Sequence, residues 1–235
     1  MQLTKELSSQ DLALFHKKSK TLIIADLHIG YEEALNKQGI LVPRFQQKEL
    51  TQRLLKILIK TNPSTIIING DFKHEFGTIS ETEWRHALRI FDLLAKHSQQ
   101  IILVKGNHDT ILGPIAKKRN LEIVDHFILN NIYITHGHKI PTNQEFKKAK
   151  TLIIAHEHPA IGIREDIRVE TFKCFLVGKW KSKNLIVMPS FNLVTEGTDI
   201  LQEQLLSPFL TNINNLEVYV VADKIYKFGK IKNII

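Results

Sequence analysis

Short runs of β-branched residues alternate with amphipathic segments in the first half of the chain. The runs lie at residues 21–26 (TLIIAD), 64–70 (STIIING) and 100–106 (QIILVKG). Between them, residues 44–60 and 80–97 repeat apolar side chains at helical spacing, and Ser80 with Glu83 has the pattern of a capping box. Strands that alternate with helices favour parallel pairing and right-handed crossovers. The first half therefore predicts a βαβαβ arrangement with a parallel sheet.

The second half has strand-like runs at closer intervals. Turn-forming residues separate several of them, at Asn130-Asn131, Lys181-Ser182-Lys183 and Asp223-Lys224. No internal repeat and no Pro/Gly/Ser-rich linker divides the sequence. We therefore expect residues 1–235 to form a single mixed α/β domain, in which a second sheet is more antiparallel than the first.

Composition places the chain among globular proteins that do not cross a membrane. It has 235 residues, 43% of them hydrophobic and 24% charged, and its apolar runs are too short to span a bilayer. The first residues lack the apolar segment of a signal peptide, and the single cysteine, Cys174, suits a reducing cytoplasm, where we expect the protein. In its strand-like run Cys174 is expected to be a small buried side chain.

The net charge of +8 permits a polyanionic partner such as nucleic acid, because lysine and arginine displace counterions from phosphates. Three basic clusters lie at residues 17–20, 147–150 and 179–183. The third contains Trp180, an aromatic residue between cations that can stack on a base. The default interpretation of each cluster is a solvated surface.

Five apolar runs are each followed by groups that can bind a metal ion. These groups are Asp26 and His28, Asp71 and His74, Asn107 and His108, His136 and His138, and His156 and His158. Functional groups gather beyond the carboxyl ends of strands in open α/β sheets. One such residue would usually be a turn or cap residue, but turns do not require histidine. The set as a whole predicts a metal site.

The donor types restrict the metal. Aspartate, asparagine and histidine without a thiolate argue against a structural zinc site of the cysteine type. Mixed imidazole and oxygen donors suit Mn²⁺, with Fe²⁺ or Zn²⁺ as alternatives. So many donors predict two divalent ions, and a carboxylate can bridge ions about 3.5–4 Å apart. Such a pair would produce hydroxide from a shared water near neutral pH and stabilise a phosphorus centre under attack.

The ordered set resembles the motifs of the calcineurin-like metallophosphoesterases. The family motifs D-x-H, G-D-x-x-(D/H), G-N-H-(D/E), H and G-H-x-H correspond to residues 26–28, 70–74, 106–109, 136 and 155–158. The resemblance implies a four-layer α/β/β/α sandwich of two mixed sheets flanked by helices. It also implies a metal-dependent hydrolase of phosphate esters.

The resemblance also implies a role for each matched residue. One metal would be held by Asp26, His28 and His158. The second would be held by Asn107, His136 and His156, with Asp71 bridging the two. His108 would be the catalytic imidazole, which contacts the scissile phosphate and helps the ester oxygen depart.

Two departures from the general pattern concern Ala155 and His74. Ala155 stands where the last motif usually has glycine. His74 stands where phosphoprotein phosphatases have aspartate, and it is similar to the pattern of the double-strand-break repair nucleases, in which this histidine partners the catalytic one. Residues 21–200 are also similar to archaeal phosphoesterases related to the SbcD nuclease subunit, whose bacterial relatives accompany a DNA ligase and a helicase. This similarity implies a nuclease-type phosphodiesterase acting on DNA in repair, with a possible ligase or helicase partner.

Two alternative functions remain open at this point. A hydrolase of small phosphodiesters or nucleotides would share every metal ligand. A non-catalytic partner subunit of a DNA-processing complex would share the fold. The sequence does not determine the oligomeric state, whether the substrate is DNA or RNA, or whether cleavage is endonucleolytic or exonucleolytic.

Several residues near the motifs have two interpretations each. Tyr31 is expected either to face the cleft or to serve only in packing at the start of a helix. Arg44 is expected either to bind a phosphate or to lie in solvent at the start of a helix. His138 supports a ligand or faces solvent, the second being favoured. Asp109 orients a neighbouring loop or caps the next helix, the cap being favoured. Residues 189–197 could line the substrate groove.

Overall fold

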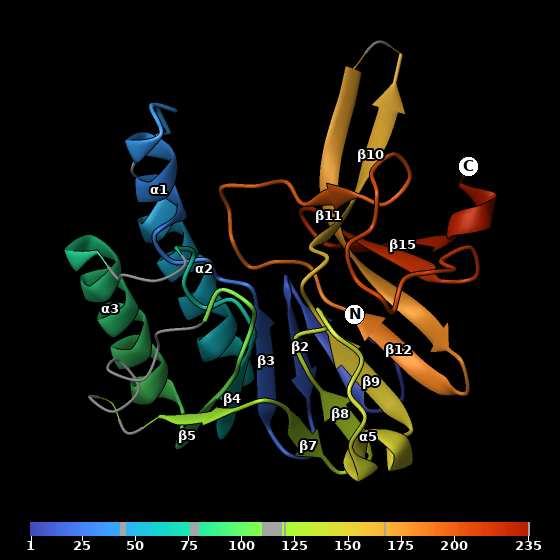
Figure 1. The fold of residues 1–235 in the computed structure, drawn as a ribbon, viewed down its shortest axis with the longest axis horizontal. Helices are drawn as coiled ribbons and strands as arrows, with labels where there is room; N and C mark the ends of the chain where they lie inside the picture. The colour runs from blue at the N-terminus through green and yellow to red at the C-terminus, as the bar shows by residue number, and fades with distance from the viewer. Residues whose placement is uncertain (43–45, 76–79, 110–118, 120, 167, 235) are drawn as a thin grey trace.

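The computed structural model contains two β-sheets packed face to face, with helices outside them (Figure 1). It describes residues 1–235 except 43–45, 76–79, 110–118, 120, 167 and 235. The described helices are α1 (Tyr31–Lys37), α2 (Gln46–Thr61), α3 (Glu81–His97) and α5 (Gln144–Lys148), with a final 3₁₀ turn at Ile231–Asn233.

The first sheet has six strands in the order in which they occur along the chain. They are β1 (Leu7–Gln10), β2 (Ala13–His16), β3 (Thr21–Ala25), β4 (Thr65–Asn69), β5 (Gln100–Val104) and β6 (Glu122–Val124). The pairs from β3 to β6 are parallel, while β1 and β2 form an antiparallel hairpin at one edge. The predicted βαβαβ unit is therefore present, and the hairpin makes the sheet mixed.

The second sheet has nine strands. They are β7 (Phe127–Leu129), β8 (Ile132–Ile134), β9 (Thr151–Ile154), β10 (Pro159–Glu165), β11 (Arg168–Trp180), β12 (Lys183–Val187), β13 (Thr198–Asp199), β14 (Glu217–Val221) and β15 (Ile225–Lys230). Strands β8, β9 and β12 are parallel neighbours at its centre. Antiparallel hairpins surround them, at the three predicted turns and also between β10 and β11.

One hydrophobic core joins the two sheets, because alternate residues of the second sheet face opposite sides. Ile153 and Ile186 belong to the core that contains β3, β4 and β5. Their neighbours Leu152 and Leu185 instead pack with Phe146 of α5 and with Phe209 on the outer face. The four layers are thus α1–α3, two sheets, and a thin outer layer of α5 and residues 200–216. The predicted sandwich class is confirmed, although its second helical layer is short.

A single domain over residues 1–235 stays a prediction. The hydrophobic core shared by the two sheets supports it. None of the helices in the described ranges has the length and hydropathy needed to cross a bilayer.

Candidate metal centre

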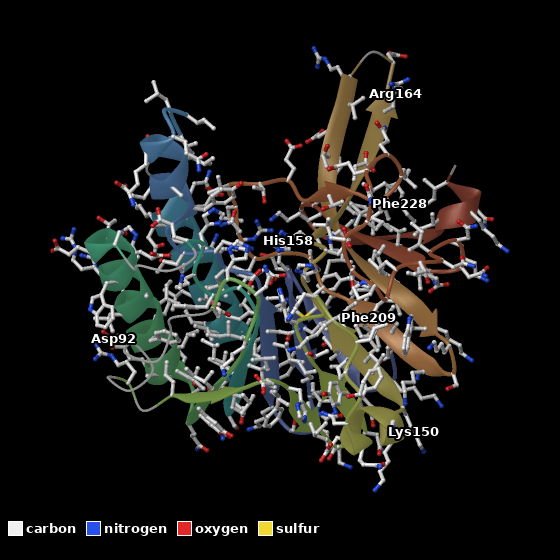
Figure 2. The ribbon with its side chains drawn as sticks, in the orientation of Figure 1. Asp92, Lys150, His158, Arg164, Phe209 and Phe228 are labelled. Carbon is white, nitrogen blue, oxygen red and sulfur yellow. The ribbon has the colours of Figure 1, made fainter. Side chains whose placement is uncertain are left out.

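The predicted ligands lie together where the parallel strands of both sheets end. Asp26 follows β3, Asp71 follows β4, and Asn107 follows β5 in the first sheet. In the second sheet His136 follows β8, and the pair at 156 and 158 follows β9. Figure 2 labels His158 near the middle of the molecule and Lys150 at its lower edge, and the two residues lie beyond opposite ends of β9. The five motifs therefore meet at one edge of the sandwich.

One group of donor atoms comes from Asp26, His28 and His158. Their nearest ligand atoms lie within 4.8 Å of one another. Nε2 of His158 lies 3.3 Å from both Nε2 of His28 and Oδ2 of Asp26. Two imidazole nitrogens and a carboxylate oxygen that point to one spot form a site of the kind that binds a divalent cation.

A second group comes from Asp71, His136 and His156, again within 4.8 Å. Nε2 of His136 lies 3.2 Å from Nδ1 of His156 and 2.9 Å from Oδ1 of Asn107. The amide oxygen of Asn107 thus joins the second group, as its place in the motif suggested.

Asp71 lies between the two groups. Its Oδ2 is 3.2 Å from Nε2 of His136 and 3.9 Å from Nε2 of His28, so one oxygen reaches both sides. Its Oδ1 accepts a hydrogen bond from the backbone N–H of His108 at 2.9 Å, which fixes the orientation of the carboxylate. This placement is the one that a bridging carboxylate requires.

The backbone at the centre adopts left-handed conformations that residues other than glycine rarely adopt. Eleven non-glycine residues in the described chain have positive φ, and five of them are predicted ligands. These five are Asp26, His28, Asp71, His156 and His158, with φ between 28° and 68°. Such strain costs on the order of 1–3 kcal/mol per residue and clusters at functional sites.

Two motif glycines allow the strand ends to approach closely. A Cβ atom on Gly70 would lie 1.9 Å from Nδ1 of His136, and one on Gly106 would lie 2.0 Å from Oδ1 of Asp71. Neither neighbour can move without displacing a predicted ligand. Glycine at both positions is therefore a packing requirement of the centre.

Burial keeps several of these histidines neutral. It lowers the pKa of His28 to about 3 and the pKa values of His74 and His156 to about 4. Burial alone would raise the pKa of Asp71, but the hydrogen bond and the charge of His136 hold it below its usual value. Neutral imidazoles beside ionised carboxylates are the protonation states that metal binding needs.

The buried polar atoms of the centre also fit a cation. Oδ1 of Asp26 and Nδ1 of His136 are 3.4 Å apart, and neither makes a hydrogen bond to a described residue. A buried carboxylate that lacks enough donors is stabilised by a positive charge next to it. The donor chemistry is therefore compatible with divalent metal ions.

His108 is oriented by the backbone of the second motif. Its Nδ1 lies 2.5 Å from the carbonyl oxygen of His74, and a carbonyl only accepts, so Nδ1 carries the hydrogen. Nε2 is then the nitrogen directed at the centre, 4.0 Å from Oδ2 of Asp71. Tyr31 stacks on His74 with ring centroids 3.8 Å apart and an interplanar angle of 16°. Of the two interpretations of Tyr31, the structure favours the one in which it contacts the cleft.

Replacing Tyr31 by alanine is expected to lower kcat for a phosphodiester about three- to tenfold, as an aromatic pair contributes about 0.5–1.5 kcal/mol. Loss of the stack would let His74 shift, and His108 would shift with it. Tyr31→Phe keeps the ring and is expected to keep most of the activity. Steady-state kinetics on bis(p-nitrophenyl) phosphate would test this, and equal losses in both variants would contradict the role of the stacked ring.

Residues 190–192 and Lys173 hold the first motif in place. Ser190 Oγ and the Asn192 N–H donate to the carbonyl oxygen of Asp26 at 2.8 and 3.1 Å, and Nδ2 of Asn192 donates to that of Leu27 at 3.1 Å. Lys173 Nζ donates to the carbonyl oxygens of Ser190 and Asn192, and burial lowers its pKa to about 7. The segment expected to line the groove thus supports Asp26 and His28 from behind.

The supporting role of Lys173 was not identified from the sequence, nor was that of Glu157, which lies between His156 and His158 in the last motif. The one available signal for Lys173 was a lysine within the apolar run 171–177. Glu157 is buried, and its Oε2 accepts hydrogen bonds from the N–H groups of Leu206 and Ser207 at 2.9 and 2.8 Å. It ties the outer layer to the turn that carries His156 and His158.

Asp109 orients a loop, which was the less favoured of its two interpretations. Oδ2 accepts a hydrogen bond from the N–H of Gly106, and Oδ1 accepts bonds from the N–H groups of Phe72 and Lys73. It therefore ties the second motif to the third, and burial raises its pKa to about 7. The helix that Asp109 was expected to cap would fall at residues 110–118, outside the described residues.

The remaining candidates lie at or away from the centre. His138 is partly buried, with its ring 5.3 Å from that of His136 and 6.0 Å from that of His156, rather than facing solvent. Arg44 is outside the described residues. Trp180 packs on Phe146 and Phe209, at the end of the second sheet away from the candidate centre. Its ring therefore contacts other side chains of the protein and is not placed to stack on a base. Cys174 is buried as expected.

Comparisons with known proteins agree with this geometry. The chain matches the calcineurin-like phosphoesterase family over residues 19–222. Its fold is similar to that of nuclease MPE from Pseudomonas putida, with a TM-score of 0.68, 19% identity, and coverage of 93% of this chain and 92% of that one. The phosphoesterase YfcE from E. coli gives a TM-score of 0.42 and 13% identity, covering 86% of this chain and 88% of that one. No curated protein matches the chain. With most of its length matched and with His/Asp groups suited to divalent metals, the chain belongs to the calcineurin-like phosphoesterases, a family of metal-dependent hydrolases.

Proposed function

We propose that the protein is a two-metal phosphodiesterase that cleaves nucleic acid. The observation that carries this proposal is the position of Asp71 Oδ2 between two separate groups of donor atoms. A monometallic site would need only one of these groups. The second group, with its own carboxylate contact and two histidines, has the composition of another cation site.

In this proposal Asp26, His28 and His158 hold one ion, and Asn107, His136 and His156 hold the other. Asp71 contacts both. Bound divalent ions would lower the pKa of water between them and neutralise charge on the phosphate oxygens. The chain's contribution is to fix the donors rigidly, through left-handed backbone turns and the support of Ser190 and Asn192.

His108 is proposed to handle the leaving group. Because Nδ1 donates to the carbonyl oxygen of His74, only Nε2 can face a phosphate bound over Asp71. From that position the imidazolium form of His108, with a hydrogen on each ring nitrogen, would donate its Nε2–H to a phosphate oxygen and pass that proton to the departing ester oxygen, which leaves the neutral ring with its hydrogen on Nδ1. His74 supports it through the backbone carbonyl and through its ring, which lies 5.5 Å from that of His108.

Nucleic acid is the proposed substrate class on two grounds. The net charge of +8 favours a polyanion, and the nuclease MPE has a similar fold over nearly the whole chain. A role in DNA repair, Mn²⁺ as the preferred ion, and a ligase or helicase partner are finer proposals. The resemblance to the SbcD-related branch supports the repair role and the partners, and the mixed donor set supports Mn²⁺.

A metal-supplemented activity screen tests the proposal. Protein stripped of metal with a chelator would be reloaded with Mn²⁺, Fe²⁺, Zn²⁺ or Mg²⁺ and given bis(p-nitrophenyl) phosphate, a dinucleotide, and single-stranded or nicked oligonucleotides. We expect turnover of the small diester and cleavage of oligonucleotides, greatest with Mn²⁺. Turnover of small diesters without oligonucleotide cleavage would favour a small-molecule hydrolase. Absence of any turnover with every metal would favour the non-catalytic subunit.

A further inference from the structure

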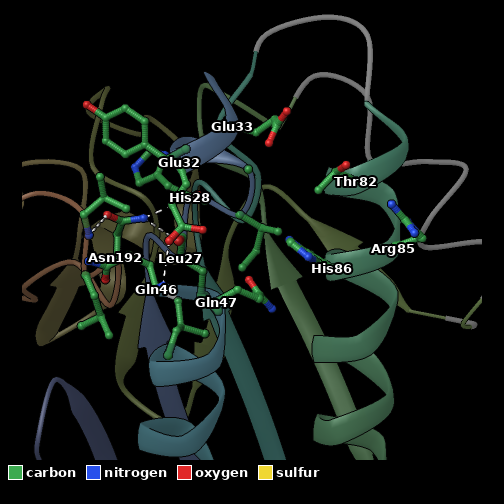
Figure 3. A pocket seen from close by; sticks show the side chains of 16 residues that line it. Leu27, His28, Glu32, Glu33, Gln46, Gln47, Thr82, Arg85, His86 and Asn192 are labelled. Carbon is green, nitrogen blue, oxygen red and sulfur yellow. Dashed lines mark hydrogen bonds between the residues drawn. The ribbon is translucent and has the colours of Figure 1, made fainter. Parts of the chain in front are cut away.

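A cavity of about 340 Å³ opens beside the candidate metal centre, between α1, α2 and α3 (Figure 3). Its polar walls include Gln46 and Gln47 of α2 and Thr82, Arg85 and His86 of α3. None of these five residues belongs to the phosphoesterase motifs.

His28 is the boundary between the cavity and the metal centre. It lines the cavity, and its Nε2 belongs to the first donor group. The wall is held in position, since Nδ2 of Asn192 donates to the carbonyl oxygen of Leu27 at 3.1 Å. The cavity and the candidate centre therefore share His28 as a common wall, so a group next to a phosphate bound at the centre would lie close to the cavity.

The cavity combines apolar surface with uncharged polar groups. Leu27, Leu50 and Leu193 line it together with the amides of Gln46 and Gln47. A heterocyclic base has flat apolar faces and polar edges, so these walls are complementary to one. Oε1 of Gln46 is buried at the wall and accepts no hydrogen bond from a described residue, which leaves it available to a donor on a base after a rotation of the side chain.

Charge at the cavity disfavours a phosphate there. Glu32 and Glu33 line it, against the single guanidinium of Arg85. Oε1 of Glu32 accepts the backbone N–H of Gln46 at 2.7 Å, which fixes one carboxylate at the beginning of α2. Burial lowers the pKa of His86, so its imidazole is neutral at neutral pH and can both donate and accept. We therefore expect the phosphate of a bound nucleotide to lie on the side of His28 that faces the metal donors, and its uncharged nucleoside part to lie in the cavity.

We propose that this cavity binds one unpaired nucleoside next to the scissile phosphate, so that the enzyme acts on single-stranded or locally unpaired nucleic acid. Its volume lies at the small end of the range for ligand sites, about 300–1,000 Å³, which suits a ligand the size of one nucleoside. A nucleotide within a duplex must leave the stack to enter, at a cost in unpairing energy. The inference rests on the phosphodiesterase function proposed above.

Filling the cavity tests the inference. In Gln47→Trp the indole would occupy the space, and the ratio of kcat/KM for a single-stranded oligothymidylate to that for bis(p-nitrophenyl) phosphate is expected to fall about tenfold, the typical value of one base contact. Gln52→Trp makes the same change at an exposed position of α2 outside this cavity and is expected to leave both values as in the wild type. His86→Ala, a smaller change, is expected to lower the same ratio less.

Binding supplies a second measurement that does not need turnover. The affinity of a fluorescein-labelled oligothymidylate, measured by anisotropy with Ca²⁺ in place of the catalytic metal, is expected to fall in Gln47→Trp and not in Gln52→Trp. The wild type is also expected to cleave a single strand faster than the same sequence in a complete duplex. An unchanged ratio in Gln47→Trp, an equal fall for both substrates, or a preference for the complete duplex would overturn the inference. Failure of the wild type on every diester would instead overturn the proposed function.

Discussion

Replacing Asp71 by asparagine is expected to lower kcat/KM for phosphodiesters more than about a hundredfold and to reduce the bound metal. Mutating a residue that only supports a ligand typically costs 10–100-fold, and Asp71 is placed to contact both ions directly. The substitution keeps the shape of the side chain but removes the negative charge between the two donor groups. It also replaces one carboxylate oxygen by an N–H₂ group, which cannot accept from the backbone N–H of His108 or bind a cation.

Two measurements would separate this effect from unfolding. Metal content per chain, determined by elemental analysis after gel filtration, is expected to fall well below that of the wild type, while the circular dichroism spectrum is unchanged. Asp125→Asn, at an exposed position between β6 and β7, is the matched control and is expected to retain metal and activity. Wild-type activity with a full metal complement in Asp71→Asn would exclude the bridging role.

The positions of the predicted ligands could be anticipated because they depend on local pattern. β-Branched runs predict strands, and parallel strands bring their carboxyl ends to one edge, so the residues that follow β3, β4 and β5 share an edge of the first sheet and those that follow β8 and β9 share an edge of the second. That the two edges adjoin was implied by the family resemblance of the ordered motifs. The helix of residues 80–97 was also predictable. Ser80 is its N-cap and accepts from the N–H of Glu83 at 3.1 Å.

The supports of the centre could not be anticipated, because they connect residues distant in sequence. Asn192 reaches the backbone of Leu27, 165 positions away, and Glu157 reaches that of Ser207, 50 positions away. No periodicity marks such pairs, since each depends on how the two sheets pack. The β10–β11 hairpin was missed because Gly162 and charged residues interrupt the apolar pattern that marks a strand. The outer segment 200–216 was missed because it contains no strand or helix that a periodic pattern could mark.

Replacing His108 by alanine is expected to lower kcat about 10²–10⁴-fold, the usual contribution of a positioned acid or base, while metal content stays at the wild-type level. His108 contacts the backbone of His74 and lies beside Asp71, and its ring forms a third cluster of donor atoms with His28 and His74, but it is outside the two donor groups assigned to the ions. Its loss should therefore remove proton transfer and phosphate contact and leave the cation sites in place. His97→Ala, near the end of α3 and outside the motifs, is the matched control and is expected to behave as the wild type.

The size of the loss should depend on the leaving group, which distinguishes proton donation from a merely structural effect. A deoxyribose alkoxide is a much stronger base than p-nitrophenolate and needs a proton as it departs. His108→Ala is therefore expected to impair oligonucleotide cleavage more than hydrolysis of bis(p-nitrophenyl) phosphate. Equal losses on both substrates would point to a role in phosphate binding alone, and loss of metal in this variant would place His108 among the ligands instead.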